Sequence, residues 1–186
     1  MIWIVLVIPL VIIIWVISKY NGLITLRNQS TNGWKQIDVQ LKRRHDLIPN
    51  LVNTVKGVME FEQDTLQKVI EARNSAISAR GVADSASKED VLSSALTKLF
   101  ALVENYPNLK SNENVKQLQE ELTSTENKIS FARQFYNDIA TKFNTEQQVF
   151  PANLLASGFG FSPVELFEIQ VASEREVPSV NLSLKK

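Results

Sequence analysis

Cysteine is absent from this sequence of 186 residues, and histidine occurs only once, as His45. Without cysteine the chain has no disulfide framework, no thiol chemistry and no cysteine-based zinc site. A single histidine excludes the His-Glu-x-x-His motif of zinc hydrolases. Lys42, not glutamate, stands three residues before His45, so the Glu-x-x-His motif of di-iron helical bundles is also missing. We therefore expect no metal and no other cofactor.

A surplus of charge of either sign is lacking as well. Twenty lysine and arginine residues balance twenty aspartate and glutamate residues. Domains that bind nucleic acid usually carry a basic surplus, which neutralises phosphates. We therefore expect no nucleic-acid partner.

Motifs of enzymatic catalysis are missing too. The chain has neither a Gly-x-Ser-x-Gly elbow nor a glycine-rich phosphate loop ending in Gly-Lys. Ser-x-x-Lys occurs at Ser85–Lys88 and Ser183–Lys186, but its companion motifs do not, so we interpret both as chance. A membrane-tethered hydrolase would need converging carboxylates such as Glu60, Glu62 or Glu71, and their helical pattern favours solvated faces. We predict that the protein is not an enzyme.

The longest apolar run, IWIVLVIPLVIIIWVI, covers Ile2 to Ile17 without a polar side chain. As a helix these sixteen residues would span roughly 24 Å, somewhat less than a hydrocarbon core of about 30 Å. Lys19 can snorkel, and aromatic residues near both ends suit the interfaces. No basic residue precedes the run and no good cleavage site follows it, as a signal peptide would require. We predict an uncleaved anchor at 1–19 that contacts the bilayer through 2–18; the alternative is a buried core helix.

Lysine and arginine near the run predict its orientation. None precedes it, whereas Lys19, Arg27 and Lys35 follow. Because positive residues favour the cytoplasmic side, we predict a single-pass protein with a short N-terminus outside and its domain in the cytoplasm.

After the anchor, apolar residues recur at helical spacing, and strand patterns are nearly absent. We predict an all-α fold: an elongated up-down antiparallel helix bundle at 20–149, with the N-terminal transmembrane helix attached. The expected helices run from the anchor to about Arg44, from Asp46 to Ser78, from Ser87 to the Asn-Tyr-Pro-Asn segment, and from Ser111 to Gln147. The last has a heptad seam with one polar member, Thr125. We expect it to pair with the second helix, which has a similar length.

A basic cluster, Lys42, Arg43 and Arg44, stands at the expected junction of the first two helices. Cations at a helix C-terminus complement the macrodipole. We interpret this stretch as a helix corner, with His45 in the turn, Asp46 as the next N-cap and Pro49 in the first turn. The cluster could also contact an acidic patch of a partner protein.

Residues 150–170 form a phenylalanine-rich segment interrupted by Gly158 and Gly160. Ser162-Pro163-Val164-Glu165 predicts the start of a short helix, and 171–186 reads as a flexible tail. The large apolar residues are too many for a free loop, so they should pack on the bundle, on a neighbouring subunit or on the membrane. Together with the basic cluster, the possible protein-contact residues are Lys42, Arg43, Arg44, Phe150, Leu154, Phe159, Phe161 and Phe167.

Three blocks closely resemble the LemA family of bacterial proteins. They are QIDVQLKRRHDLIPNLV within residues 20–76, YPNLKSNENVKQLQEELTSTENKISFARQFYN, and FPANLLASGFGF. The resemblance covers Tyr20 to about Phe167. It implies a helical bundle anchored in the bacterial cell membrane, with the N-terminus outside and the domain inside. The family has no established general activity; its members are associated with membrane proteases, antigen presentation at the cell surface and bacterial membrane organelles.

Missing catalytic motifs, long helices and an anchor together favour a membrane-anchored scaffold or assembly protein that self-associates at the membrane, so we expect a homo-oligomer. The alternative is an adaptor or regulator of a membrane protease or transporter, with that membrane protein as its partner. Both need only an anchor and an exposed helix face, so the sequence does not separate them.

Overall fold

The computed structural model describes residues 2–59 and 62–168, with side chains placed from residue 7 onward. Within these ranges the chain forms six helices and no strand, which confirms the predicted all-α bundle with an apolar N-terminal helix. The helices are α1 (Ile2–Lys56), α2 (Gln63–Ile77), α3 (Gly81–Val103), α4 (Pro107–Lys110), α5 (Glu113–Gln148) and α6 (Ala152–Gly158).

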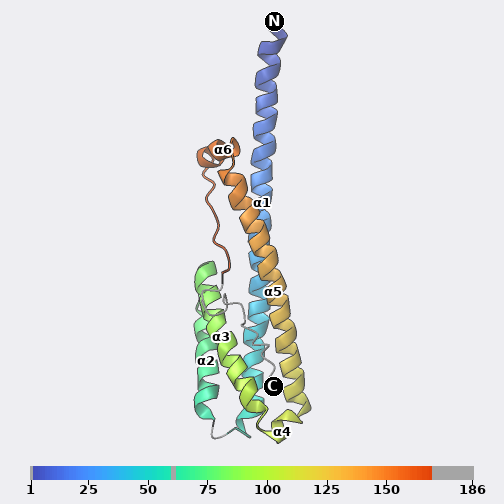
Figure 1. Ribbon diagram of the computed structural model, residues 1–186, viewed down its shortest axis with the longest axis vertical. Coiled ribbons are helices and arrows are strands. Elements are labelled where there is room, and N and C mark those ends of the chain that lie inside the picture. Colours follow the sequence, from blue (N-terminus) through green and yellow to red (C-terminus); the bar gives the residue numbers. More distant parts are fainter. Residues whose placement is uncertain (1, 60–61, 169–186) are drawn as a thin grey trace, which may run out of the picture.

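Helix α1 extends beyond the bundle at its N-terminal end (Figure 1). It contains a stretch long and apolar enough to cross a membrane, and only 6% of that stretch's most apolar window is buried inside the protein. Its side chains from Val7 to Ile14 are exposed. A core helix would be covered by its own protein, so this exposure favours a membrane anchor.

The predicted helix corner at Arg44–Asp46 is wrong, because α1 continues through it to Lys56. Pro49 lies inside the helix, and its missing N–H leaves the carbonyl of His45 without its usual donor. Arg73 of α2 replaces that donor, with Nε 2.6 Å from the His45 oxygen. The turn comes instead after Lys56, where α1 ends.

Helix α5 runs antiparallel along α1, and the α2–α3 hairpin packs beside this pair (Figure 1). The prediction that α5 pairs with the second helix is therefore wrong. The second helix ends at Ile77 after 15 residues, too short to match the 36 residues of α5. Thr125, the polar residue of the heptad seam, is buried and its hydroxyl donates to the Glu121 carbonyl.

The core is divided into three clusters along the molecule. The first joins α1, α2, α3 and α5 around Leu51, Leu66 and Leu99. The second lies around Ile37, Ile129, Tyr136 and Phe167, and the third around Leu23, Phe143 and Ala156. Helix α3 begins at Gly81, earlier than the predicted Ser87, and Gly81 itself has a positive φ of 81°.

The predicted helix after Ser162 is also wrong. The short helix of the phenylalanine-rich segment is α6, which precedes Gly160 with its φ of 70°. Residues 161–168 instead form a non-helical strap along α5 (Figure 1). The predicted flexible tail, 171–186, lies outside the described residues.

Candidate functional site

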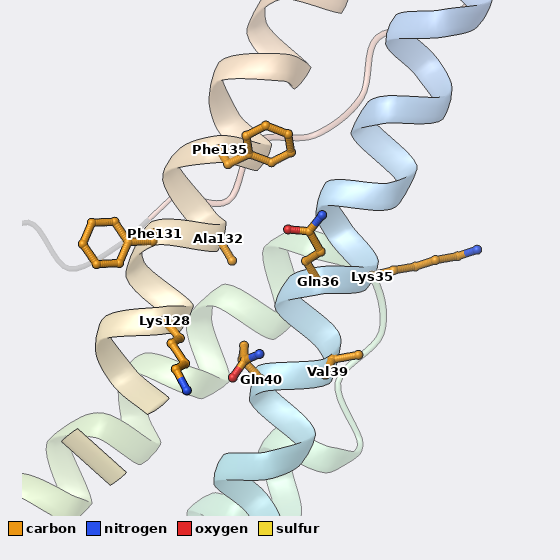
Figure 2. Close-up of a pocket in the computed structure, with 8 residues that line it drawn as sticks. All are labelled: Lys35, Gln36, Val39, Gln40, Lys128, Phe131, Ala132 and Phe135. Atoms are coloured by element: carbon orange, nitrogen blue, oxygen red, sulfur yellow. The ribbon is translucent and has the colours of Figure 1, made fainter. Parts of the chain in front are cut away.

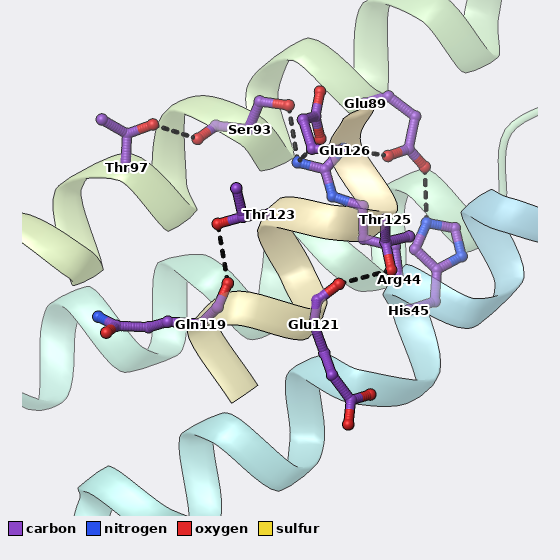
Figure 3. A network of polar contacts seen from close by, with 10 residues as sticks. All are labelled: Arg44, His45, Glu89, Ser93, Thr97, Gln119, Glu121, Thr123, Thr125 and Glu126. Atoms are coloured by element: carbon purple, nitrogen blue, oxygen red, sulfur yellow. Dashed lines mark hydrogen bonds and ion pairs between the residues drawn. The ribbon is translucent and has the colours of Figure 1, made fainter. Parts of the chain in front are cut away.

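A buried charged cluster joins α1, α3 and α5 (Figure 3). Glu89 is only 1% exposed, and its two carboxylate oxygens face different partners on α1. Oε2 accepts from Nη1 of Arg44 at 3.1 Å, and Oε1 lies 2.6 Å from Nε2 of His45. Arg44 Nη2 also contacts Ser93 Oγ at 2.7 Å and Glu126 Oε2 at 3.1 Å. The buried guanidinium is thus bound by two carboxylates and a hydroxyl, which offsets the cost of removing it from water.

The contacts of this cluster are made between helices of the bundle. Both Glu89 oxygens are occupied by residues of α1, so neither is free for a substrate. A cavity of about 330 Å³ lies beside His45, lined in part by Lys42 and Ser85. Among the described residues, no three histidine, aspartate or glutamate side chains are grouped to hold a metal ion.

The three basic residues singled out in the sequence do not share one surface. Lys42 is exposed and pairs with Asp46 at 2.6 Å, and this hydrogen bond lowers the pKa of the Asp46 carboxyl. Arg43 lies 3.6 Å from Glu121 on α5. Arg44 points into the cluster described above and is 3% exposed. Asp46 is therefore a residue within α1 and not an N-cap, and His45 is a buried helical residue.

An apolar groove of about 490 Å³ lies between α1 and α5 (Figure 2). Its exposed apolar side chains are Val39 (62% exposed), Phe131 (73%) and Phe135 (45%). Lys35 and Lys128 also line it. Neither phenylalanine is among the contact residues predicted from the sequence. Their signal is a pair of aromatic residues four apart on α5, off the heptad seam.

Within the same groove, the Gln40 side-chain oxygen is buried without a hydrogen-bond partner among the described residues. Buried acceptors are nearly always paired, because leaving one unpaired costs free energy. Because this oxygen is buried below the surface, it is not a contact point for a partner protein.

The phenylalanine-rich segment divides into buried and exposed residues. Phe167 is 3% exposed and packs against Trp34, while Arg133 lies over its ring at 4.2 Å. Burial lowers the pKa of that arginine. Phe161 packs against Phe143. The exposed members of the segment are Phe150 (80%), Leu154 (66%) and Phe159 (57%).

Asparagine side chains of α5 hold the strap that contains Phe167. The Asn137 amide donates to the Phe167 carbonyl at 3.0 Å and accepts from its N–H at 2.8 Å. Asn144 makes the same two bonds with Val164, at 2.8 and 2.9 Å. Tyr136 donates to the Glu165 carbonyl at 2.6 Å, and burial raises the pKa of its hydroxyl.

The sequence model of the LemA family matches residues 33–182, which include the groove, the charged cluster and the strap. The chain belongs to the LemA family. It is 28% identical over 171 residues to Protein LemA of Metamycoplasma hominis, covering 90% of this chain and 75% of that relative. It is 23% identical to Magnetosome protein MamQ 2 of Paramagnetospirillum magneticum and 22% identical to Magnetosome protein MamQ of Magnetospirillum gryphiswaldense. Each of these two alignments covers 87% of this chain and 69% of the relative.

Proposed function

We propose that this LemA-family protein is a membrane-anchored, non-enzymatic helical scaffold that self-associates through the groove between α1 and α5. The observation that carries the proposal is the exposed apolar face formed by Val39, Phe131 and Phe135. Clustered exposed apolar residues of this kind mark interaction surfaces. The relatives named as magnetosome proteins support a role in a larger cellular assembly.

The anchor supports association through a lateral face. In this proposal α1 crosses a bacterial cell membrane, with its short N-terminus outside and the bundle in the cytoplasm, because Lys19, Arg27 and Lys35 follow the apolar run. Copies in one bilayer then share one orientation, so the groove of one copy meets the same face of the next. Confinement to the membrane raises the effective concentration, so a small contact suffices.

Charged side chains flank the exposed phenylalanines of the groove. Lys128, Phe131, Phe135 and Asp138 follow one another at steps of three, four and three along α5, so they share one side of that helix. Lys128 and Asp138 carry opposite charges at the two ends of this row, and Lys35 adds a cation from α1. Copies with the same orientation bring like ends of this row together, so self-association rests on covering the apolar side chains and not on pairing Lys128 with Asp138.

The proposal is tested by the mass of the full-length protein in detergent, measured by native mass spectrometry or light scattering. We expect a defined oligomer that dissociates when Phe131→Ser and Phe135→Ser are combined. Ile77→Ser with Val91→Ser is the matched control, because these residues are 52% and 58% exposed on α2 and α3. The control should keep the parent's mass.

A parent protein that is monomeric at all concentrations would contradict self-association. Copurification of such a monomer with a stoichiometric membrane protein would favour the adaptor alternative. In that case the two serine substitutions in the groove should release the partner.

A further inference from the structure

A second apolar surface lies at the other end of α5, around α6. Phe150, Leu154 and Phe159 are 80%, 66% and 57% exposed, although each is large and apolar. The thirteen residues 149–161, VFPANLLASGFGF, contain no charged side chain. Large apolar side chains gathered on one exposed corner without a charge are informative, whereas single exposed apolar residues are common.

This corner is attached to α1 immediately after the apolar run. The Phe159 ring lies 4.9 Å from the Tyr20 ring, and Ala156 of α6 packs with Leu23. Lys19 forms an ion pair of 3.1 Å with Glu146 near the end of α5. Figure 1 shows α6 beside α1, at the end of the bundle nearest the N-terminus.

Helical rise places the corner at the height of the membrane surface. The nineteen residues from Ile2 to Tyr20 span about 28 Å, close to a hydrocarbon core of about 30 Å. Tyr20 then lies at the interface, where tyrosine is enriched. Because Phe159 contacts Tyr20, α6 lies at the same depth.

We propose that the α6 corner inserts Phe150, Leu154 and Phe159 into the interfacial region of the bilayer that α1 spans. The partner of this surface is lipid: the acyl chains next to the headgroups would cover the exposed apolar side chains, while Lys19 lies near enough to meet phosphates. A second attachment beside α1 limits the tilt of the bundle relative to the membrane. The proposal requires α1 to span the bilayer, but it does not depend on the groove or on self-association.

The absence of native cysteine allows a direct test with the full-length chain. Leu154→Cys carries a nitroxide label in nanodiscs of phosphatidylcholine and phosphatidylglycerol that each hold one copy. Electron paramagnetic resonance then measures the collision of the label with oxygen, which concentrates in lipid, and with a water-soluble nickel chelate. Phe131→Cys, on the exposed groove, is the aqueous reference, and Ile12→Cys is the bilayer reference. Phe150→Cys repeats the test at a second exposed position.

We expect the oxygen-to-nickel accessibility ratio at Leu154 and Phe150 to exceed that at Phe131 severalfold, toward the value at Ile12. A ratio at both positions equal to that at Phe131 would show that the corner lies in water and would overturn the proposal. Low accessibility to both reagents would show that protein covers the corner, with the same consequence. If the accessibility ratio at Ile12 equals that at Phe131, α1 does not span the bilayer, and the proposal, which requires a spanning α1, is overturned. None of these outcomes depends on whether the serine substitutions in the groove change the oligomer.

Discussion

Arg73 of α2 donates a hydrogen bond of 2.6 Å from Nε to the backbone carbonyl of His45, four residues before Pro49. In a regular helix this carbonyl accepts from the N–H of residue 49, which proline does not have. A side chain from a neighbouring helix thus replaces a backbone donor. This replacement is one reason that α1 continues past a proline to Lys56.

Removing the replacement donor should destabilise the bundle only while the proline is present. We expect Arg73→Leu to lower the free energy of unfolding by about 1–3 kcal/mol, because the carbonyl loses its partner. In a Pro49→Ala background the same substitution should cost clearly less, since alanine restores the backbone N–H. Urea titration followed by circular dichroism in detergent measures both. Equal costs in the two backgrounds would show that the bond does not compensate for the proline.

The buried pair of Arg44 and Glu89 supports a second prediction. Glu89→Leu leaves Arg44 with Glu126 and Ser93 only, and it removes the partner of His45. We expect a loss of about 3 kcal/mol, as for other broken buried pairs. Combining it with Arg44→Met should restore part of the stability, because no buried charge is left uncompensated.

Lys42→Met is the control for this experiment, since its ion pair with Asp46 lies on the exposed side of the same helix. It should leave the urea midpoint nearly unchanged. If Glu89→Leu had as little effect as the control, the cluster would contribute nothing to the stability of the bundle.

These two contacts explain why the sequence predicted a helix corner where none exists. A basic cluster followed by proline is typical of a helix end. Such sequence patterns take only neighbouring residues into account. The groups that override them, Arg73 and Glu89, are 28 and 45 residues away from their partners on α1. The all-α class and the heptad seam depend on local periodicity, and the apolar N-terminal helix depends on one continuous apolar run, and that is why they could be predicted.

The strap supports a third prediction, because two asparagine side chains carry most of its backbone hydrogen bonds. Asn137 and Asn144 are seven residues apart, about 10 Å along a helix. Their partners Phe167 and Val164 are three residues apart, about 10 Å of extended chain. Combining Asn137→Ala with Asn144→Ala should therefore release the strap. Hydrogen exchange at residues 164–167 should accelerate by an order of magnitude or more, as expected for the loss of about 1–3 kcal/mol.

Asn127→Ala, on the exposed side of α5, is the matched control and should leave exchange in the strap unchanged. Unchanged exchange in the double variant would mean that Phe167 and its aromatic contacts hold the strap without the asparagines.

The same pairing explains why Ser162-Pro163-Val164-Glu165 does not start a helix. An extended backbone presents the N–H and carbonyl of one residue together to a side-chain amide, as a helix does not. Asparagine spacing on α5 therefore overrides a local helix signal. Among the candidate contact residues, composition could identify the phenylalanine-rich segment. It could not separate exposed Phe159 from buried Phe167, because that depends on where α6 places the chain.

Gly33 of α1 supports the last prediction, because its backbone lies close to α5. A Cβ atom at this position would lie 3.4 Å from the Tyr136 Cα and 3.5 Å from the Phe135 ring. That leaves room for a methyl group but not for a branched side chain. Gly33→Val should force the helices apart and cost about 1–3 kcal/mol of unfolding free energy.

Gly22→Val is the control, since nothing lies within 4 Å of a Cβ there, and helix propensity alone favours that substitution. Because Phe135 lines the groove, Gly33→Val should also reduce the mass of the oligomer, whereas Gly22→Val should not. Equal effects of the two substitutions on stability would show that the helices do not depend on this close approach.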